Sequence, residues 1–377
     1  MFFFYIADQE YQGKNECWVE YLKNMPELEI NTHGVQNQSH DRRVAPKEAN
    51  VSVKSGAFFS TMLVIVSVFI ALGLAEAALF LKNSSMRNYD IEMWRYSKEL
   101  KKESENPMLG HEHIPSKEAI LQSIKIRINS HGLRGDEIKP KQEGIKRILF
   151  LGSSITLGWG VAEEETLTER LVDMFDAEGK PTEVLNAGVG NYNSVRYVEQ
   201  FLTRLTHLEP NVIVVQYFVN DAESIEFSRG NWFLRNSQFG VTLWTAWNQL
   251  FRSKGKEALL KHYNLTYAPN TRGFQDMFSA LKRLAGYAKD KKISIVFVMT
   301  PDFHNFKDYP FDSIHHSMAE ISRDLGFVYV DLLPTFLHRD AKKLWSTPGD
   351  PHPNSFGHEL MANTLYPFLK NPDLYIN

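Results

Sequence analysis

One stretch, residues 147–160, constrains the fold of this 377-residue chain more than any other, and it reads RILFLGSSITLGWG. Residues 147–151 form a short apolar run without polar alternation, as expected of a strand that is buried on both faces. The run ends at Gly152, two serines follow, and an acidic helix start comes at residues 163–166. A strand that ends in a small-residue turn before a helix is where α/β proteins place their chemistry. A hydroxyl there can be a nucleophile, a phosphate ligand or a turn-forming side chain.

Strand-like and helix-like segments alternate along the rest of the chain. Short apolar strands are predicted at residues 183–186, 212–217, 293–299 and 327–330. The segments between and after them predict helices at residues 195–207, 271–289, 313–325 and 357–369. In the second of these helices, apolar side chains recur with the 3.6-residue period of one helix face. Alternation of this kind implies a parallel sheet with helices on both faces, which is an α/β fold.

Composition excludes several classes of function. The net charge is −3 and no dense basic tract occurs, so we expect no nucleic-acid partner. Cys17 is the only cysteine, which rules out an intramolecular disulfide. The sequence contains no CxxC, HExxH or clustered metal ligands, and its glycine-containing turn lacks the GxxxxGK[ST] pattern of a nucleotide-binding loop. We therefore expect neither a metal nor a cofactor.

A long apolar segment precedes the alternating region. Residues 57–75 contain no charge, Glu76 interrupts the run, and apolar residues continue to Leu81. Because about 20 apolar residues span a bilayer, residues 57–81 predict one transmembrane helix. A buried core helix would show a polar face, and a cleaved signal peptide has an apolar run of only about 7 to 15 residues. Basic residues flank both ends, so the positive-inside rule does not decide the orientation.

The remaining segments carry weaker signals. Residues 1–56 are polar and irregular, and we expect them to be flexible. Residues 82–145 predict a charged connector, with a solvated helix or linker at 97–106 and a short hairpin at 124–138 that turns at His131 and Gly132. Residues 226–269 form an aromatic-rich insertion. The insertion can be a helical excursion with its own small core, or a cap over the carboxyl edge of the sheet.

Three further polar segments follow predicted strands or precede the last helix. They are NAGVGN at residues 186–191, FVND at 218–221 and DPHPN at 350–354. With the serines, they supply a hydroxyl, main-chain donors, a carboxamide, an imidazole and a carboxylate, which is the set that acyl transfer needs. A serine hydroxyl needs a base, for which His352 is the candidate, and Asp350 is close enough in sequence to fix the imidazole tautomer.

With these four blocks in order, the chain resembles the SGNH (GDSL-type) hydrolases from residue 147 to about residue 369. This family is named for its catalytic Ser, Gly, Asn and His. The resemblance implies a three-layer, flavodoxin-like parallel sheet of five strands over residues 146–371, the SGNH hydrolase fold. It also implies that Ser154 is the nucleophile and His352 the base, with Asp350 as orienting carboxylate. The residues expected to stabilise the oxyanion are Ser154, Gly190, Asn191 and Asn220.

Four departures from the family pattern bear on these assignments. Ser153 replaces the aspartate that usually precedes the nucleophile and leaves a rival hydroxyl. Phe218 stands where the third block has glycine. The glycine of the second block falls on Asn191, directly after Gly190, and the choice between their N–H groups stays open. Asp350 precedes the histidine by two residues where the family has three, which should weaken its orienting role.

The sequence therefore predicts a membrane-anchored serine hydrolase acting on an ester, with an O-acetylated glycan or a lipid as substrate. An O-acyltransferase shares the acyl-enzyme step, so the sequence does not separate the two. A non-catalytic scaffold or glycan-binding protein of an envelope assembly is the alternative from a different class. The resemblance alone places the catalytic domain outside the cytoplasm, because anchored members commonly act on envelope glycans and lipids.

Overall fold

The structure is a computed structural model that describes residues 52–224, 234, 236–251 and 256–371. Most of the N-terminal segment predicted to be flexible lies outside these residues. The centre of the fold is a sheet of five parallel strands in the order β6-β5-β7-β8-β9. This is the flavodoxin-like order, and it confirms the predicted α/β fold. The strands are β5 (Lys146–Gly152), β6 (Thr182–Gly188), β7 (Val212–Phe218), β8 (Ser294–Thr300) and β9 (Val328–Asp331).

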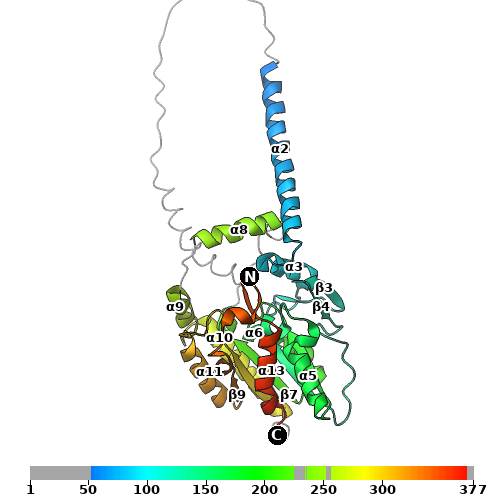
Figure 1. Cartoon of the computed structure of the whole chain (residues 1–377), viewed down its shortest axis with the longest axis vertical. Helices are drawn as coiled ribbons and strands as arrows, with labels where there is room; N and C mark the ends of the chain where they lie inside the picture. Colours follow the sequence, from blue (N-terminus) through cyan, green and yellow to red (C-terminus); the bar gives the residue numbers. More distant parts are fainter. Residues whose placement is uncertain (1–51, 225–233, 235, 252–255, 372–377) are drawn as a thin grey trace, which may run out of the picture.

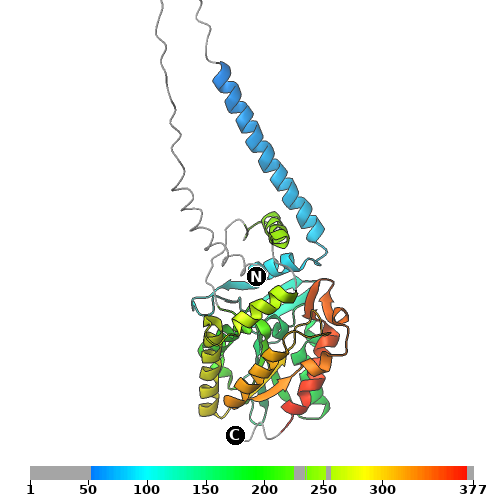
Figure 2. The same ribbon diagram turned by 90° about the vertical axis from the view of Figure 1, so that its left-hand side faces the viewer.

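Helices cover both faces of the sheet (Figures 1 and 2). Successive strand residues point to opposite faces, so β5 sends Leu149 and Leu151 into one core and Ile148 and Phe150 into the other. The first core is closed by α6 (Ser194–Gln200), α10 (Arg272–Lys291) and α11 (Asp312–Asp324). The second is closed by α5 (Leu167–Ala177), α12 (Leu333–Phe336) and α13 (Ser355–Leu369). The helix predicted at 195–207 is irregular after α6, with a π-helical turn (Phe201–Leu205) and a 3₁₀ turn (Thr206–Leu208).

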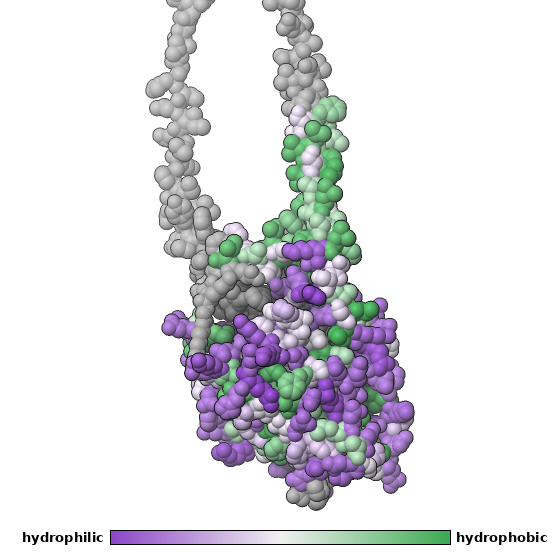
Figure 3. All heavy atoms as spheres, viewed as in Figure 1, coloured by the Kyte–Doolittle hydropathy of each residue, from purple (hydrophilic) through white to green (hydrophobic). Residues whose placement is uncertain are grey.

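The predicted membrane segment forms α2 (Ser52–Asn83), which projects away from the domain (Figures 1 and 2). Within the described chain, its Phe58–Asn83 part is long and apolar enough to cross a membrane, and the most apolar 18 residues of that part contain no buried residue. Hydrophobic side chains gather along α2 and at its base, whereas the visible face of the domain is largely hydrophilic (Figure 3).

The connector packs onto the domain. Its elements are α3 (Tyr89–Glu99), β1 (Lys101–Glu103), β2 (His111–His113), β3 (Lys117–Leu121) and β4 (Ile124–Ile128). Tyr96 of α3 and Ile126 of β4 share a third buried cluster with Leu157 and Trp159, which come three and five residues after Ser154. Leu100 of the stretch predicted as a solvated helix or linker is buried in the same cluster, so this stretch packs on the domain.

The connector contains a hairpin, but it covers residues 117–128 and not the predicted residues 124–138. Strands β3 and β4 pair antiparallel with Leu121 opposite Ile124, so Gln122 and Ser123 make a two-residue turn. Both turn residues have positive φ, 49° and 64°, as a type I′ turn requires. The predicted turn at His131 and Gly132 leads only to an isolated bridge between Ile128 and Arg134. Gln-Ser lacks the Asn-Gly signature of such turns, so no local pattern in the sequence indicates this turn.

The aromatic insertion contributes two helices with different surroundings. Helix α9 (Lys256–Thr266) joins the first core through buried Tyr263, and Tyr267 just after it donates a hydrogen bond to the carbonyl of Val219 at 3.0 Å. Helix α8 (Gln238–Phe251) instead lies across the base of α2, beside α3 (Figures 1 and 2). Helix α9 therefore packs at the carboxyl edge of the sheet, whereas α8 lies apart from the two main cores.

Candidate active site

The two serines lie at the carboxyl end of β5. The strand stops at Gly152, Ser153 directly precedes the short helix α4 (Ser154–Leu157), and Gly158 ends that helix with φ of 77°. A side chain at position 152 would collide with the Thr156 hydroxyl and lie 2.9 Å from the carbonyl of Gln216. Glycine is therefore required for β5 to turn so tightly into α4, and this turn presents Ser154 at the edge of the sheet.

Ser154, His352 and Asp350 form one chain of hydrogen bonds. The Oγ of Ser154 lies 2.8 Å from Nε2 of His352, and Nδ1 of the same ring lies 2.6 Å from Oδ1 of Asp350. With Nδ1 protonated toward the carboxylate, Nε2 presents its lone pair to the serine hydroxyl. Ser153 is buried, and its side chain makes no hydrogen bond with any residue of the described chain. The geometry thus couples Ser154, and not its neighbour, to the imidazole.

Asp350 is fully buried and held by several donors. Its Oδ2 accepts hydrogen bonds from Gln122 Nε2 at 2.7 Å and from Trp159 Nε1 at 3.1 Å. Burial by itself would raise the pKa of this carboxyl, but the charge of His352 and the hydrogen bonds from His352 and Gln122 outweigh it and bring the pKa to about 2. Asp350 is therefore a carboxylate at neutral pH and can stabilise an imidazolium beside it.

The two-residue spacing between Asp350 and His352 is explained by a short strand. Both residues lie on β11 (Asp350–Pro353), which pairs antiparallel with β10 (Trp345–Thr347). In an extended strand, residues two apart point to the same side, which brings carboxylate and imidazole together. The weaker orienting geometry expected from the shorter spacing is therefore absent, since the strand gives the 2.6 Å contact directly.

The loop after β6 distinguishes Gly190 from Asn191. The Gly190 N–H already donates to the Tyr96 hydroxyl at 2.9 Å, and its carbonyl accepts from His111 Nε2 at 3.0 Å and Lys101 Nζ at 3.3 Å. The Asn191 N–H donates to no residue in the described part of the chain. Asn191 also has φ of 66°, a conformation that favours glycine and that asparagine tolerates better than most residues. Of the two amides, the one of Gly190 is occupied and the one of Asn191 has no acceptor among the described residues.

Asn220 lies in a 3₁₀ turn (Val219–Ala222) that follows β7. Strand β7 is the neighbour of β5, with Gln216 in register with Gly152, so Asn220 emerges at the same sheet edge as Ser154. Its Nδ2 donates to no described residue, and its Oδ1 is buried without a partner. Phe218 is extended, with φ of −130°, so this backbone does not need the glycine of the family pattern.

The structure adds three residues that the sequence did not indicate. Gln122 and Trp159 bind Asp350, and the Tyr89 ring packs against the His352 ring with centroids 5.7 Å apart and planes 30° apart. Gln122 and Tyr89 come from the connector, outside the four sequence blocks. No spacing or pattern could have indicated them, because only the folded connector brings them to the site.

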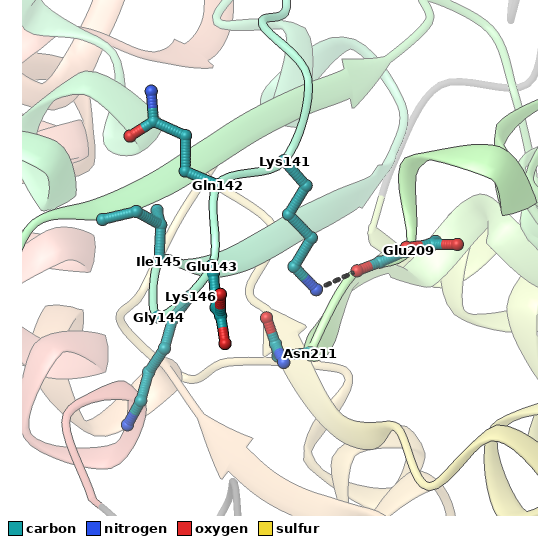
Figure 4. A pocket seen from close by; sticks show the side chains of 8 residues that line it. All are labelled: Lys141, Gln142, Glu143, Gly144, Ile145, Lys146, Glu209 and Asn211. Carbon is teal, nitrogen blue, oxygen red and sulfur yellow. Dashed lines mark hydrogen bonds between the residues drawn. The ribbon is translucent and has the colours of Figure 1, made fainter.

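A pocket elsewhere on the described surface lies apart from these residues. A shallow pocket at the opposite, amino-terminal edge of the sheet is shown in Figure 4, where Lys141 donates to the Glu209 carbonyl at 2.6 Å. It contains none of the candidate site residues. The pocket is lined by Lys141, Gln142, Glu143, Gly144, Ile145, Lys146, Glu209 and Asn211.

Within the described residues, no group of three or more His, Cys, Asp or Glu side chains is placed to hold a metal ion.

A known family matches the part of the chain that contains the candidate site. Residues 150–360, more than half of the chain, match the model of the GDSL-like lipase/acylhydrolase family. No curated protein sequence matches significantly.

Several solved structures are similar at low identity. TesA is 13% identical with a TM-score of 0.39, covering 60% of this chain and 98% of TesA. The acetylxylan esterase Axe2 from Geobacillus stearothermophilus is 14% identical with a TM-score of 0.41, covering 62% of this chain and 97% of Axe2. A two-domain esterase active on acetylated mannans is 18% identical with a TM-score of 0.40, covering 62% of this chain and 50% of that protein.

Proposed function

The chain belongs to the GDSL-like lipase/acylhydrolase family, and on this premise we propose that it is a serine esterase that works through a covalent acyl-enzyme. The observation that carries the proposal is the hydrogen-bonded series from Ser154 through His352 to Asp350. A serine placed 2.8 Å from an imidazole that is oriented by a buried carboxylate has what nucleophilic catalysis requires.

The proposed reaction has two halves. As Ser154 Oγ attacks the acyl carbonyl, its proton passes to His352 Nε2, and Asp350 stabilises the resulting imidazolium. The carbonyl oxygen becomes an oxyanion, which accepts hydrogen bonds from the Asn191 N–H and from Asn220 Nδ2. Collapse of this intermediate breaks the ester bond, and Nε2 returns the proton to the leaving alcohol. Water then repeats both steps on the acyl-enzyme and releases the acid.

Turnover of a simple ester tests this function. The purified chain is expected to hydrolyse p-nitrophenyl acetate and to lose that activity on treatment with a fluorophosphonate. An acyltransferase of the same mechanism would deacylate slowly in water and faster when a sugar hydroxyl is supplied as acceptor. A chain that binds an acetylated glycan without any turnover would support a scaffold or binding role and contradict the esterase proposal.

Asn220→Ala is expected to lower kcat by about 10²–10³-fold, on the order of 3 kcal/mol, with a much smaller change in KM. The reason is that the side-chain N–H would stabilise charge that develops only in the transition state. Initial rates with p-nitrophenyl acetate measure both constants. Asn305→Ala, in an exposed loop, is the matched control and should behave as the parent protein. An unchanged kcat in Asn220→Ala would remove this residue from the oxyanion site.

We also propose that α2 anchors the protein in a membrane, with the catalytic domain on the extracytoplasmic side and an O-acetylated glycan or a lipid ester as substrate. The uncharged run at 57–75 supports the anchor, since about 19 residues of helix extend about 28 Å, close to the thickness of a bilayer core. Carbonate washing should therefore leave the chain in the membrane pellet, and protease added to spheroplasts should digest the domain. Release by carbonate would contradict the anchor, and a protected domain would reverse the orientation.

A further inference from the structure

Helix α8 exposes an apolar face beside the base of α2. Leu243, Trp247 and Leu250 are 52%, 60% and 78% exposed. Their spacing of four and three residues places them on one side of the helix. The sequence of α8, QFGVTLWTAWNQLF, contains no charged residue. The outer face of a helix on a water-facing surface normally carries charged side chains, so this face is unusual for one that contacts water alone.

The position of α8 relative to α2 is fixed by polar contacts. The Glu76 carboxylate of α2 accepts hydrogen bonds from the Gln238 N–H at 2.6 Å, the Phe239 N–H at 3.0 Å and the Ser237 hydroxyl at 2.8 Å. A carboxylate at the first turn of a helix satisfies amides that have no partner within that helix. Asn83 Nδ2 adds a hydrogen bond to Gln238 Oε1 at 3.0 Å. These contacts hold α8 crosswise at one end of α2.

The contact between Glu76 and α8 lies near one end of the apolar run of α2. The uncharged run of α2 ends at Ala75, so Glu76 comes where a helix that started at residue 57 would leave the hydrocarbon core. The first turn of α8 is hydrogen-bonded to Glu76 and therefore lies at the same depth as that residue. Exposed basic residues follow within the next part of the chain, at Lys82, Arg87 and Lys98. Basic side chains just beyond the end of a membrane helix suit anionic lipid headgroups.

We propose that α8 is an interfacial helix, with Leu243, Trp247 and Leu250 in the boundary between the headgroups and the acyl chains of the bilayer that α2 crosses. This inference rests on the proposed anchoring by α2. A membrane is favoured as the occupant of this face because the face continues the apolar surface of α2 at the same level (Figure 3). Amphipathic helices with tryptophan and leucine on the apolar side bind bilayers in this way.

The placement of α2 and α8 also bears on which substrate can reach the site. Helix α2 ends at Asn83, and six residues later the ring of Tyr89 packs on His352. Six residues extend at most about 20 Å, so the catalytic imidazole stays close to the membrane surface. With α8 lying flat on the bilayer, the site is held beside that surface. The substrate class that this arrangement fits is an ester carried by a lipid or by a lipid-linked glycan.

Spin labels in the full-length protein test the position of α8. In a Cys17→Ser background, single cysteines replace Leu250, Phe69 of α2, or Lys289 near the exposed end of α10, and the protein is placed in nanodiscs of phosphatidylcholine and phosphatidylglycerol. Collision rates with oxygen and with a water-soluble nickel chelate report the depth of each label. The label at Leu250 is expected to shift from the aqueous ratio of Lys289 toward the bilayer ratio of Phe69. A Leu243→Cys label repeats the measurement should the first variant fold poorly.

The outcomes separate this inference from the anchor itself. A water-like ratio at Leu250 together with a bilayer-like ratio at Phe69 would overturn the interfacial helix and leave the anchor intact. Dipolar broadening between two labels at Leu250, with little access for either quencher, would overturn it in favour of a second copy of the chain. A water-like ratio at Phe69 would contradict the proposed anchor, and the interfacial helix would fall with it.

Discussion

Ser154→Ala is expected to lower kcat for p-nitrophenyl acetate by about 10⁴–10⁶-fold. The hydroxyl that lies 2.8 Å from His352 Nε2 would be lost, and no other side-chain hydroxyl of the described chain is hydrogen-bonded to that nitrogen. The fold should tolerate the change, because one partly buried hydrogen bond contributes only about 1 kcal/mol to stability. Thermal unfolding of the variant should therefore stay close to that of the parent protein.

The adjacent serine provides the matched control. Ser153→Ala removes the same hydroxyl one residue earlier, where the side chain is buried and makes no hydrogen bond with the described residues. We expect most of the activity to survive, with a partial loss from altered packing of the turn. If Ser153→Ala were inactive and Ser154→Ala active, the roles of the two serines would be reversed.

Asp350→Asn is expected to lower kcat by about 10⁴-fold while KM changes little. A neutral amide cannot stabilise the imidazolium, and it can hold His352 in the wrong tautomer. The pKa of Asp350, about 2, lies below the ordinary value of 3.8, so the carboxylate is charged throughout the neutral range. Its contribution to stability is present above pH 3.8 and is lost as the pH falls toward 2. Rates measured between pH 6 and 8 therefore compare the charged Asp350 of the parent protein with the neutral asparagine of the variant.

A second Asp–His pair with the same spacing serves as control. Asp302 Oδ1 lies 3.0 Å from Nδ1 of His304, whose ring is largely exposed and has no hydrogen bond to either serine. Asp302→Asn makes the same chemical change and should leave kcat nearly unchanged. Equal losses in the two variants would mean that the effect at Asp350 is general destabilisation and not loss of an orienting carboxylate.

The sheet could be predicted because its strands are buried on both faces. Continuous apolar runs such as residues 212–217 leave little ambiguity, and β7 begins at the same residue and ends one residue later. The connector could not be predicted in the same way. Residues 97–106 are mostly charged or polar, yet Leu100 within them is buried in one cluster with Leu157 and Trp159. Such long-range packing leaves no periodic signal in a short segment.

In the candidate site, too, some residues could be predicted from sequence blocks and others only from tertiary packing. Ser154, His352, Asp350 and Asn220 follow strands or lie on a short hairpin in the blocks of the family pattern, and the structure brings the first three into one hydrogen-bonded series. Their catalytic roles stay predictions. The sequence showed no difference between the amides of Gly190 and Asn191, whereas the structure shows that the Gly190 N–H is occupied by Tyr96. Gln122 and Tyr89 reach the site through tertiary packing alone.

The most direct test of the central claim, that Ser154 is acylated during turnover, is the site of fluorophosphonate attachment. The full-length protein would be labelled in detergent, digested, and its peptides mapped by mass spectrometry with fragmentation between residues 153 and 154. The account predicts one stoichiometric adduct on Ser154, absent from Ser154→Ala and present in Ser153→Ala. An adduct on Ser153, or an active esterase that takes up no label, would contradict it.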